Sequence, residues 1–295
     1  MAPRAIITGA AGLIGQYVMQ SAARWAPGWE VHGLTRADLD LTDQAAVEQT
    51  WLRIDPQAVI HCAALSRTKD CEHQPELARR INVDATAQLA RLSNDIPFIF
   101  LSSGEVFDGR QGWYREEDSP NPINVYGKTK LEAERLVLEN LRHTVLRIVL
   151  TAGISQQGDR SFVEDLCRLA KRGVNASLYA DEFRTPLPAG SIARAIWELC
   201  AKTVPGLYHL GGRERLSRWD IGQALLPWYP ELQGRLIEGS ARSHAGAPRP
   251  ADLSLNCEKI QTVVSFPIPG FRSWLESRMH RDGDLWDYEP ACRKR

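Results

Sequence analysis

Short runs rich in apolar residues alternate with amphipathic segments along the first 210 residues. The runs predict buried strands at residues 5–7, 30–35, 58–62, 97–101, 144–150 and 207–210. Between them, apolar positions that recur every three or four residues predict helices at residues 13–25, 43–54, 75–92, 125–141 and 192–200. This alternation favours an α/β fold with a doubly wound parallel sheet that is covered on both faces.

The pattern changes after residue 150, where short segments interrupt the alternation. We expect the sheet domain to comprise residues 1–150 and 190–212. A smaller C-terminal lobe would then comprise residues 151–189 and 213–280, with helices capped by Ser217 and over 271–279. The charged segment 281–295 is typical of a mobile tail.

Three glycines, Gly9, Gly12 and Gly15, follow the first predicted strand at three-residue intervals. In a strand–turn–helix unit, such glycines allow the turn, the approach of backbone N–H groups to a pyrophosphate, and close packing of helix on strand. The helix that follows presents its positive dipole end to the phosphates. The motif predicts a Rossmann-like dinucleotide-binding domain, and its alternative is a tight turn without a ligand.

Charge and cysteine content argue against several classes of protein. With 36 basic and 36 acidic side chains, the chain has no net field to attract nucleic acid or an anionic membrane. No window reaches the length of a membrane span, and the short N-terminal apolar run is interpreted as a strand, not a signal peptide. Six scattered cysteines favour reduced thiols in a cytoplasmic protein. His61, Cys62, Cys71 and His73 match no common zinc spacing, so we expect no metal.

Tyr126 and Lys130 stand four residues apart in one predicted helix, so their side chains share a face. A phenol ordinarily titrates near pH ~10, and a neighbouring ammonium lowers its pKa. Such a tyrosine can exchange a proton with a carbonyl or an alcohol. The alternative is a solvated helix face, on which this pair is common.

Ser103 follows the buried run 97–101 directly. Ligands of open α/β sheets bind outside the carboxyl ends of the strands, so a serine there can hold a substrate oxygen beside the phenol. Taken alone, it would be an ordinary polar strand end. The order of glycine turn, strand-end serine and helical Tyr-x-x-x-Lys is much harder to obtain by chance.

These elements together resemble the extended short-chain dehydrogenase/reductase family, and most closely its dTDP-4-dehydrorhamnose reductase group. The similarity spans residues 4–255. It rests on the glycine turn, Ser103, Tyr126 and Lys130, and on further matches at residues 61–64, 101–109, 126–131, 181–183, 186 and 249–250.

The resemblance implies specific roles for the matched residues. Tyr126 would protonate a substrate ketone as hydride arrives from the reduced nicotinamide, Lys130 would bind the nicotinamide ribose, and Ser103 would orient the carbonyl. Asn82 would support this catalytic framework. The remaining expected cofactor contacts are Gly9, Gly12, Leu13, Ile14, Gly15, Asp40, Leu41, Ala63 and Ala64.

Two departures from the group alter the expected substrate pocket. Gly104 and Glu105 stand where the group has Asp-Tyr, so the substrate contacts there must differ. Glu105 is similar to a glutamate of sugar-nucleotide 4,6-dehydratases, but Gly104 removes the partner acid, so we do not expect dehydration. Thr151-Ala152-Gly153 replaces the family's Tyr-Gly after the sixth strand.

Three arginines are candidates for phosphate contacts. Arg36 directly follows the second strand, where a guanidinium can bind a 2′-phosphate, so we expect NADPH in preference to NADH. Asp38 could instead bind an unphosphorylated ribose. Arg184 and Arg249 are candidates for the substrate's diphosphate, with surface ion pairs as the alternative.

The sequence thus predicts an NADPH-dependent reductase of a nucleotide-activated 4-keto sugar. The partner would be this small-molecule substrate, and we also consider a homodimer. One alternative is a cofactor-binding regulatory protein that resembles the methionine adenosyltransferase beta subunit. Another is an NAD-dependent sugar-nucleotide epimerase.

Overall fold

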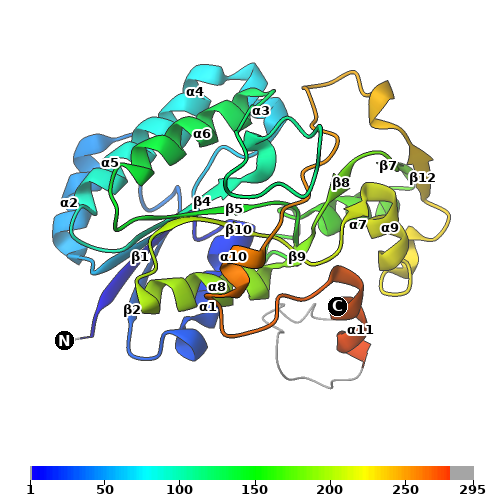
Figure 1. Cartoon of the computed structure of the whole chain (residues 1–295). Helices are drawn as coiled ribbons and strands as arrows, with labels where there is room; N and C mark the ends of the chain where they lie inside the picture. Colours follow the sequence, from blue (N-terminus) through cyan, green and yellow to red (C-terminus); the bar gives the residue numbers. More distant parts are fainter. Residues whose placement is uncertain (1, 280–295) are drawn as a thin grey trace.

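The central element of the structure, a computed structural model that describes residues 2–279, is a six-stranded sheet (Figure 1). All its strands are parallel, in the order β10–β5–β4–β3–β1–β2. This confirms the predicted doubly wound α/β fold. The strands are β1 (Arg4–Thr8), β2 (Glu30–Leu34), β3 (Ala58–His61), β4 (Phe98–Ser103), β5 (Thr144–Ile148) and β10 (Gly206–Leu210).

Helices cover both faces of this sheet, as Figure 1 shows. Below it in that view lie α1 (Leu13–Trp25) and α8 (Ala189–Lys202). The buried Trp197 of α8 donates its indole N–H to the carbonyl of Val18 at 3.0 Å and so joins the two helices. The opposite face packs buried Phe98 and Phe100 under α2 (Gln44–Ile54), α5 (Ala85–Leu92) and α6 (Val125–Leu138).

The winding of the chain creates a crevice above the centre of the sheet. From β1 the chain moves outward to β2, and it then returns to place β3 on the other side of β1. Ligands of such sheets bind at the carboxyl ends of the strands where the direction reverses. The switch point therefore lies at the carboxyl ends of β1 and β3.

The predicted helix over residues 75–92 is divided in the structure. It consists of α4 (Pro75–Arg79), a π-helical turn (Arg80–Asp84) and α5. A π turn adds a residue to the helical ladder and commonly occurs at functional sites. The buried Asn82 lies in this turn, and α3 (Thr68–His73) precedes α4.

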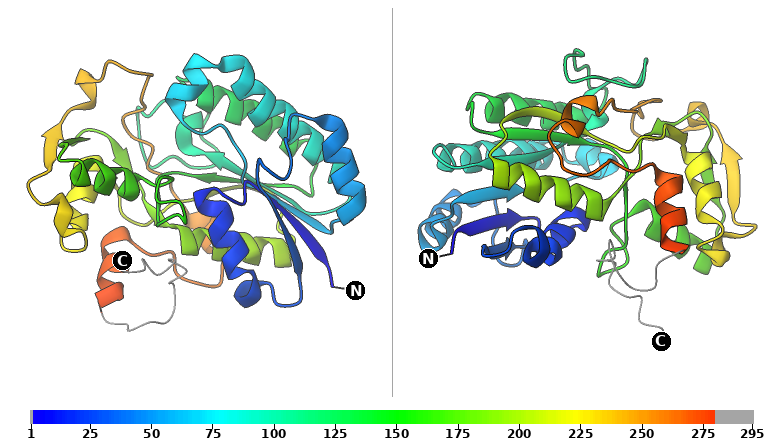
Figure 2. Two further views of the ribbon diagram at one scale, coloured as in Figure 1. Left: turned by 180° about the vertical axis from the view of Figure 1, so that it is seen from behind. Right: turned by 60° about the horizontal axis from the view of Figure 1, so that its bottom comes forward.

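A second group of elements packs beside the sheet (Figure 2). It has its own apolar core, which includes Leu178, Leu225 and Phe271. These elements are β6 (Thr151–Ala152), α7 (Phe162–Lys171), β7 (Ala176–Tyr179), β8 (Phe183–Arg184), β9 (Leu187–Pro188), β11 (Leu216–Ser217), α9 (Arg218–Leu225), β12 (Leu236–Gly239) and α11 (Phe271–Met279). A short α10 (Glu258–Gln261) packs on β10. The predicted tail 281–295 lies outside the described residues. Within residues 2–279, no helix has both the length and the apolar character needed to cross a bilayer.

Ser217 caps α9 as expected, because its hydroxyl accepts the Asp220 N–H while the Asp220 carboxylate accepts the Ser217 N–H. Helix α7 was not predicted. It starts with the same reciprocal arrangement of Ser161 and Glu164, which is visible in the sequence as Ser-x-x-Glu before an apolar stretch.

Candidate active site

A cavity of about 760 Å³ lies at the switch point of the sheet. The residues expected to contact a cofactor all line it: Gly9, Gly12, Leu13, Ile14, Gly15, Arg36, Asp40, Leu41, Ala63, Ala64, Tyr126 and Lys130. These residues come from the ends of β1, β2 and β3 and from the start of α6. The structure therefore brings together motifs that are more than 100 residues apart.

The glycine turn is tight because two of its members have no room for a side chain. Gly9 has φ +68°, and a Cβ there would lie 2.7 Å from the Ala63 nitrogen. A Cβ on Gly15 would overlap the Gly9 carbonyl oxygen. At Gly12 a Cβ would meet only that same oxygen, at 3.1 Å, so the rest of the space beside it is open. Gly12 caps α1 without a side-chain hydrogen bond, so backbone N–H groups are available to a phosphate.

The end of β2 presents one cation and one anion to the cavity, Arg36 and Asp40. Asp38 does not line the cavity, because it is used inside its own turn. Its Oδ2 accepts hydrogen bonds from the Thr35 hydroxyl at 2.6 Å and the Thr35 N–H at 2.9 Å, and these lower the pKa of Asp38.

Tyr126 is placed by the close packing of α6 on a 3₁₀ turn, Gly104–Val106, that follows β4. A Cβ on Gly127 would overlap the Glu105 carbonyl oxygen, so only glycine permits this approach. Asn124 caps the helix by accepting the Gly127 N–H at 2.8 Å. Ser103, at the end of β4, hydrogen-bonds with Tyr126 and accepts the Glu105 N–H at 3.1 Å.

The pKa of Tyr126 is shifted in the direction opposite to the expectation. Burial and the Glu105 carboxylate raise the pKa of Tyr126, and the hydrogen bond with Ser103 only partly opposes them. The predicted lowering by an ammonium is therefore wrong for this structure. Burial lowers the pKa of Lys130 to about 7. Its Nζ donates to the Leu101 carbonyl at 2.6 Å and lies 3.9 Å from the centre of the Phe100 ring.

Asn82 lies behind the cavity wall and does not line it. Its Nδ2 donates to the Leu65 carbonyl at 3.1 Å and to the Thr129 hydroxyl at 3.0 Å, while its Oδ1 accepts the Leu65 N–H at 2.8 Å. Leu65 itself lines the cavity. Asn82 thus ties the cavity wall to α6.

The proposed substrate arginines surround one buried carboxylate, Glu182. This carboxylate contacts Arg249 at 2.8 Å, Arg218 at 2.9 Å and Arg184 at 3.2 Å. Burial alone would raise the pKa of Glu182, but the Arg249 hydrogen bond and the three positive charges outweigh it and lower the pKa to about 2. We call these four residues the Glu182 cluster.

Neither Arg184 nor Arg249 lines the cavity. Arg184 is buried, whereas the Arg249 side chain is 38% exposed and remains accessible to a ligand. Glu105 connects the Glu182 cluster to the start of α6: its carboxylate accepts a hydrogen bond from Asn124 Nδ2 at 2.8 Å and lies 3.8 Å from the Arg184 guanidinium. Gly104 provides close packing instead of a polar contact, because a Cβ there would lie 2.6 Å from Val149.

Sequence reasoning missed one wall of the cavity. Arg160, Ser161 and Phe162 line it from the lobe. The Ser-x-x-Glu pattern at Ser161 could have revealed the helix, but no local signal shows that it faces the cavity. Within the described range, no cluster of His, Cys, Asp and Glu could hold a metal ion.

Comparisons with known proteins agree with this architecture. A family model described as the RmlD substrate binding domain matches residues 3–282. Methionine adenosyltransferase 2 subunit beta from Bos taurus is 32% identical over 276 residues, covering 88% of this chain and 82% of that protein. dTDP-4-dehydrorhamnose reductase from Sinorhizobium fredii is 29% identical over 281 residues, covering 90% of this chain and 93% of that protein.

The solved structure of dTDP-4-dehydrorhamnose reductase from Bacillus anthracis in complex with NADP has a TM-score of 0.84 to this chain. It is 24% identical, and the match covers 94% of this chain and 98% of that one. This likeness supports the fold. Since the family model matches nearly the whole chain, the protein belongs to the RmlD substrate binding domain family, with the extended short-chain dehydrogenase/reductase fold.

Proposed function

We propose that this protein is an NADPH-dependent reductase of a nucleotide-activated 4-keto sugar. The observation that carries the proposal is the convergence of Tyr126, hydrogen-bonded to Ser103, and the glycine turn on one cavity. That arrangement supports a proton donor beside a dinucleotide site. The resemblance to dTDP-4-dehydrorhamnose reductase supports the substrate class.

The residues of the cavity fit NADPH. The glycine turn leaves open space and N–H groups for the pyrophosphate, and Lys130 would bind the nicotinamide ribose. Arg36 faces the cavity while Asp38 is held by Thr35, which favours a 2′-phosphate over a free ribose hydroxyl. When bound, the reduced nicotinamide supplies a hydride. NADH would bind more weakly.

Tyr126 would act as the general acid. The uncharged phenol can donate its proton to the ketone oxygen as that oxygen gains negative charge. Burial and Glu105 favour this uncharged form. Ser103 would hold the same oxygen in place by a hydrogen bond. Asn82 would hold Leu65 and α6 in position through its hydrogen bonds with both. Arg249 is the exposed cation available to a substrate phosphate.

The test is NADPH consumption across a panel of 4-keto nucleotide sugars that includes dTDP-4-dehydrorhamnose. Removing a general acid typically costs about 10²–10⁴-fold in rate, so Tyr126→Phe is expected to lose activity by that factor while keeping NADPH affinity. Tyr208→Phe is the matched control, because Tyr208 lies on β10 and its hydroxyl bonds the Pro205 carbonyl. Undiminished turnover in Tyr126→Phe would reject the assigned role.

A second candidate function is a regulatory subunit. The 32% identity to methionine adenosyltransferase 2 subunit beta supports it. A stable complex with a methionine adenosyltransferase catalytic subunit, together with no NADPH oxidation on the sugar panel, would favour this function over the reductase. A cytoplasmic location and a homodimer stay predictions of the first proposal.

A further inference from the structure

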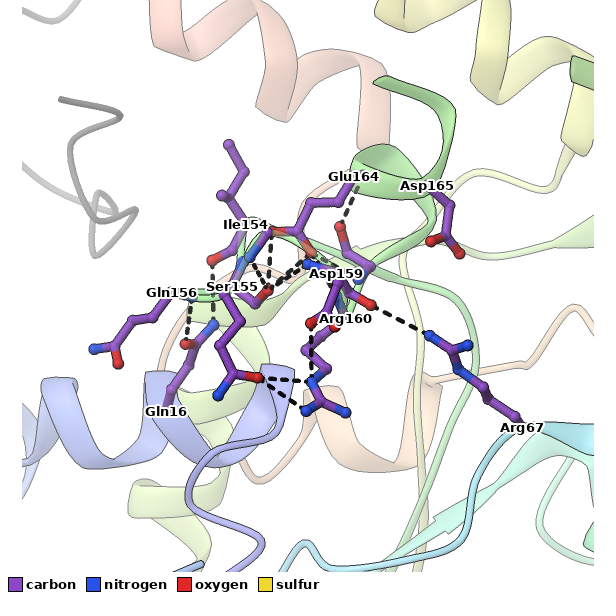
Figure 3. A network of polar contacts seen from close by, with 12 residues as sticks. Gln16, Arg67, Ile154, Ser155, Gln156, Asp159, Arg160, Glu164 and Asp165 are labelled. Carbon is purple, nitrogen blue, oxygen red and sulfur yellow. Dashed lines mark hydrogen bonds and ion pairs between the residues drawn. The ribbon is translucent and has the colours of Figure 1, made fainter. Parts of the chain in front are cut away.

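Residues 154–161, which we call the strap, connect β6 to α7 and join two walls of the cavity. On one side, Gln16 of α1 donates Nε2 to the Ile154 carbonyl at 3.2 Å and accepts the Gln156 N–H at 2.9 Å. On the other, Arg67 donates to the Asp159 carbonyl at 3.4 Å. Figure 3 shows the strap between Gln16 and Arg67, and in the left view of Figure 2 this green segment lies beside the start of blue α1.

One buried carboxylate determines the shape of the strap. Glu164 accepts the N–H groups of Ser155 at 2.5 Å, Arg160 at 2.8 Å and Ser161 at 2.8 Å, and also the Ser155 hydroxyl (Figure 3). These donors come from both ends of the strap. Glu164 therefore folds the segment into one conformation and sets the direction in which Arg160 leaves the backbone.

Arg160 lines the cavity, and among the residues that the structure describes its guanidinium contacts only neighbours on the strap. Its guanidinium hydrogen-bonds the Gln157 side-chain oxygen at 2.9 and 3.1 Å and pairs with Asp159 at 3.1 Å. Arg160 and Asp159 are 46% and 45% exposed, and exposed pairs of this kind contribute little. The guanidinium can therefore exchange these partners for a phosphate at small cost.

The other cations that line the cavity are assigned to other parts of the cofactor. Among the lining residues within the described chain, Arg36 and Asp40 lie together after β2, and Lys130 is buried against the Leu101 carbonyl. Arg160 is the remaining cation. It belongs to a segment anchored on Gln16, four residues after Gly12 of the glycine turn.

We propose that Arg160 binds the pyrophosphate of the dinucleotide from the lobe side, and that Glu164 is the residue that positions it. The proposal rests on the proposed function for the identity of the cofactor. The pyrophosphate would then lie between backbone N–H groups of the glycine turn and a guanidinium, whose geometry matches phosphate oxygens. The strap would bind the cofactor and the two cavity walls together.

The first test compares two probes, NADPH and adenosine 2′-monophosphate, which has the 2′-phosphate but no pyrophosphate. Their affinities are measured by calorimetry for the wild type, Arg160→Ala and the matched control Arg168→Ala, an arginine of α7 that pairs with Asp165. Loss of a charged hydrogen bond predicts that Arg160→Ala raises the Kd for NADPH about 10–100-fold. The Kd for adenosine 2′-monophosphate should stay unchanged, and Arg168→Ala should alter neither.

An equal loss for both probes, or no loss for either, would overturn the assignment of Arg160.

The second test measures NADPH dissociation by stopped flow in Glu164→Gln, with Asp165→Asn as its control. Faster release in Glu164→Gln alone supports the positioning role, and equal rates contradict it. If the wild type binds NADPH and reduces no 4-keto sugar, only the proposed function fails; if it binds no dinucleotide, both fail.

Discussion

The sheet side of the cavity and the lobe beside it are built by different means. On the sheet side, the turn from Gly9 to Gly15 forms a surface of backbone and small or apolar side chains, and Arg36, Asp40 and Lys130 also line the cavity. In the lobe, Arg160, Ser161 and Phe162 line the cavity, and the framework is the Glu182 cluster outside the lining, in which one buried carboxylate binds Arg184, Arg218 and Arg249. The first side depends on steric space and the second on balanced charge.

This difference explains which side could be recognised from local sequence. The glycine turn occupies seven consecutive residues. Gly9 and Gly15 have no room for a side chain, because Ala63 lies against the first and the Gly9 carbonyl oxygen against the second. The Glu182 cluster joins residues 182 to 249, and its contacts depend on the packing of β8, α9 and a later loop. No spacing rule connects those positions.

The largest effect is expected when the charge of Glu182 is removed. Glu182→Gln leaves three arginines without their shared counter-charge, so we expect a loss of about 3–5 kcal/mol in the free energy of unfolding. Urea denaturation measures it. Glu238→Gln, on the exposed surface of β12, is the control and should change little. A stability loss as small as the control's would mean that the lobe does not depend on balanced charge.

The next test fills space on the sheet side. Gly9→Ala forces a side chain into a positive-φ position and against Ala63, which should cost about 2–4 kcal/mol of unfolding free energy and abolish NADPH binding. Gly28→Ala separates the two causes, because Gly28 has φ +91° with nothing within 4 Å of a Cβ. It should lose only about 1 kcal/mol. Equal losses in the two variants would exclude the steric explanation.

A smaller effect is expected at the cofactor's adenine end. Arg36→Ala should weaken NADPH binding about tenfold, or about 1.4 kcal/mol, and leave NADH binding nearly unchanged. Fluorescence titration with both nucleotides measures the ratio of their dissociation constants. If NADH binds the wild type more tightly than NADPH does, the assignment of Arg36 to a 2′-phosphate is wrong.

The smallest expected effect is the loss of stability in mild acid. Its pH range differs between His61 in the sheet and Glu182 in the lobe. Burial lowers the pKa of His61 on β3 to about 3, so unfolding takes up a proton below the ordinary value of 6.5 and stability falls as the pH falls. Between pH 7 and 6 this amounts to less than about 1 kcal/mol. The charge of Glu182, whose pKa is about 2, loses its contribution only as the pH falls from 4.5 towards 2.

His61→Asn should therefore reduce the dependence of unfolding free energy on pH between 7 and 6. Part of the dependence remains, because burial also lowers the pKa of His209 to about 3. The exposed His73 serves as the control, and His73→Asn should keep the wild-type slope. An unchanged slope in His61→Asn would show that another group takes up the proton.

Much of the fold was predictable because apolar periodicity reports burial directly. The run 97–101 is buried on both faces of β4, and the spacing of Tyr126 and Lys130 did place both on the cavity. The sign of the Tyr126 pKa shift was not predictable, since it depends on burial and on Glu105, which tertiary packing brings beside it. Arg184 was expected at a phosphate, and only the structure shows that Glu182 holds it. Arg160 was missed because a loop arginine carries no mark of the surface that it faces.

Glu105 has a consequence for how this family could be re-engineered. Its carboxylate raises the pKa of Tyr126 and also lies beside Arg184, so the lobe and this phenol share one electrostatic environment. A chimaera that exchanged the lobe for another member's would also exchange part of that environment. Under the proposed function, recognition of a new sugar and the pH optimum for its reduction would then be inherited as a single trait.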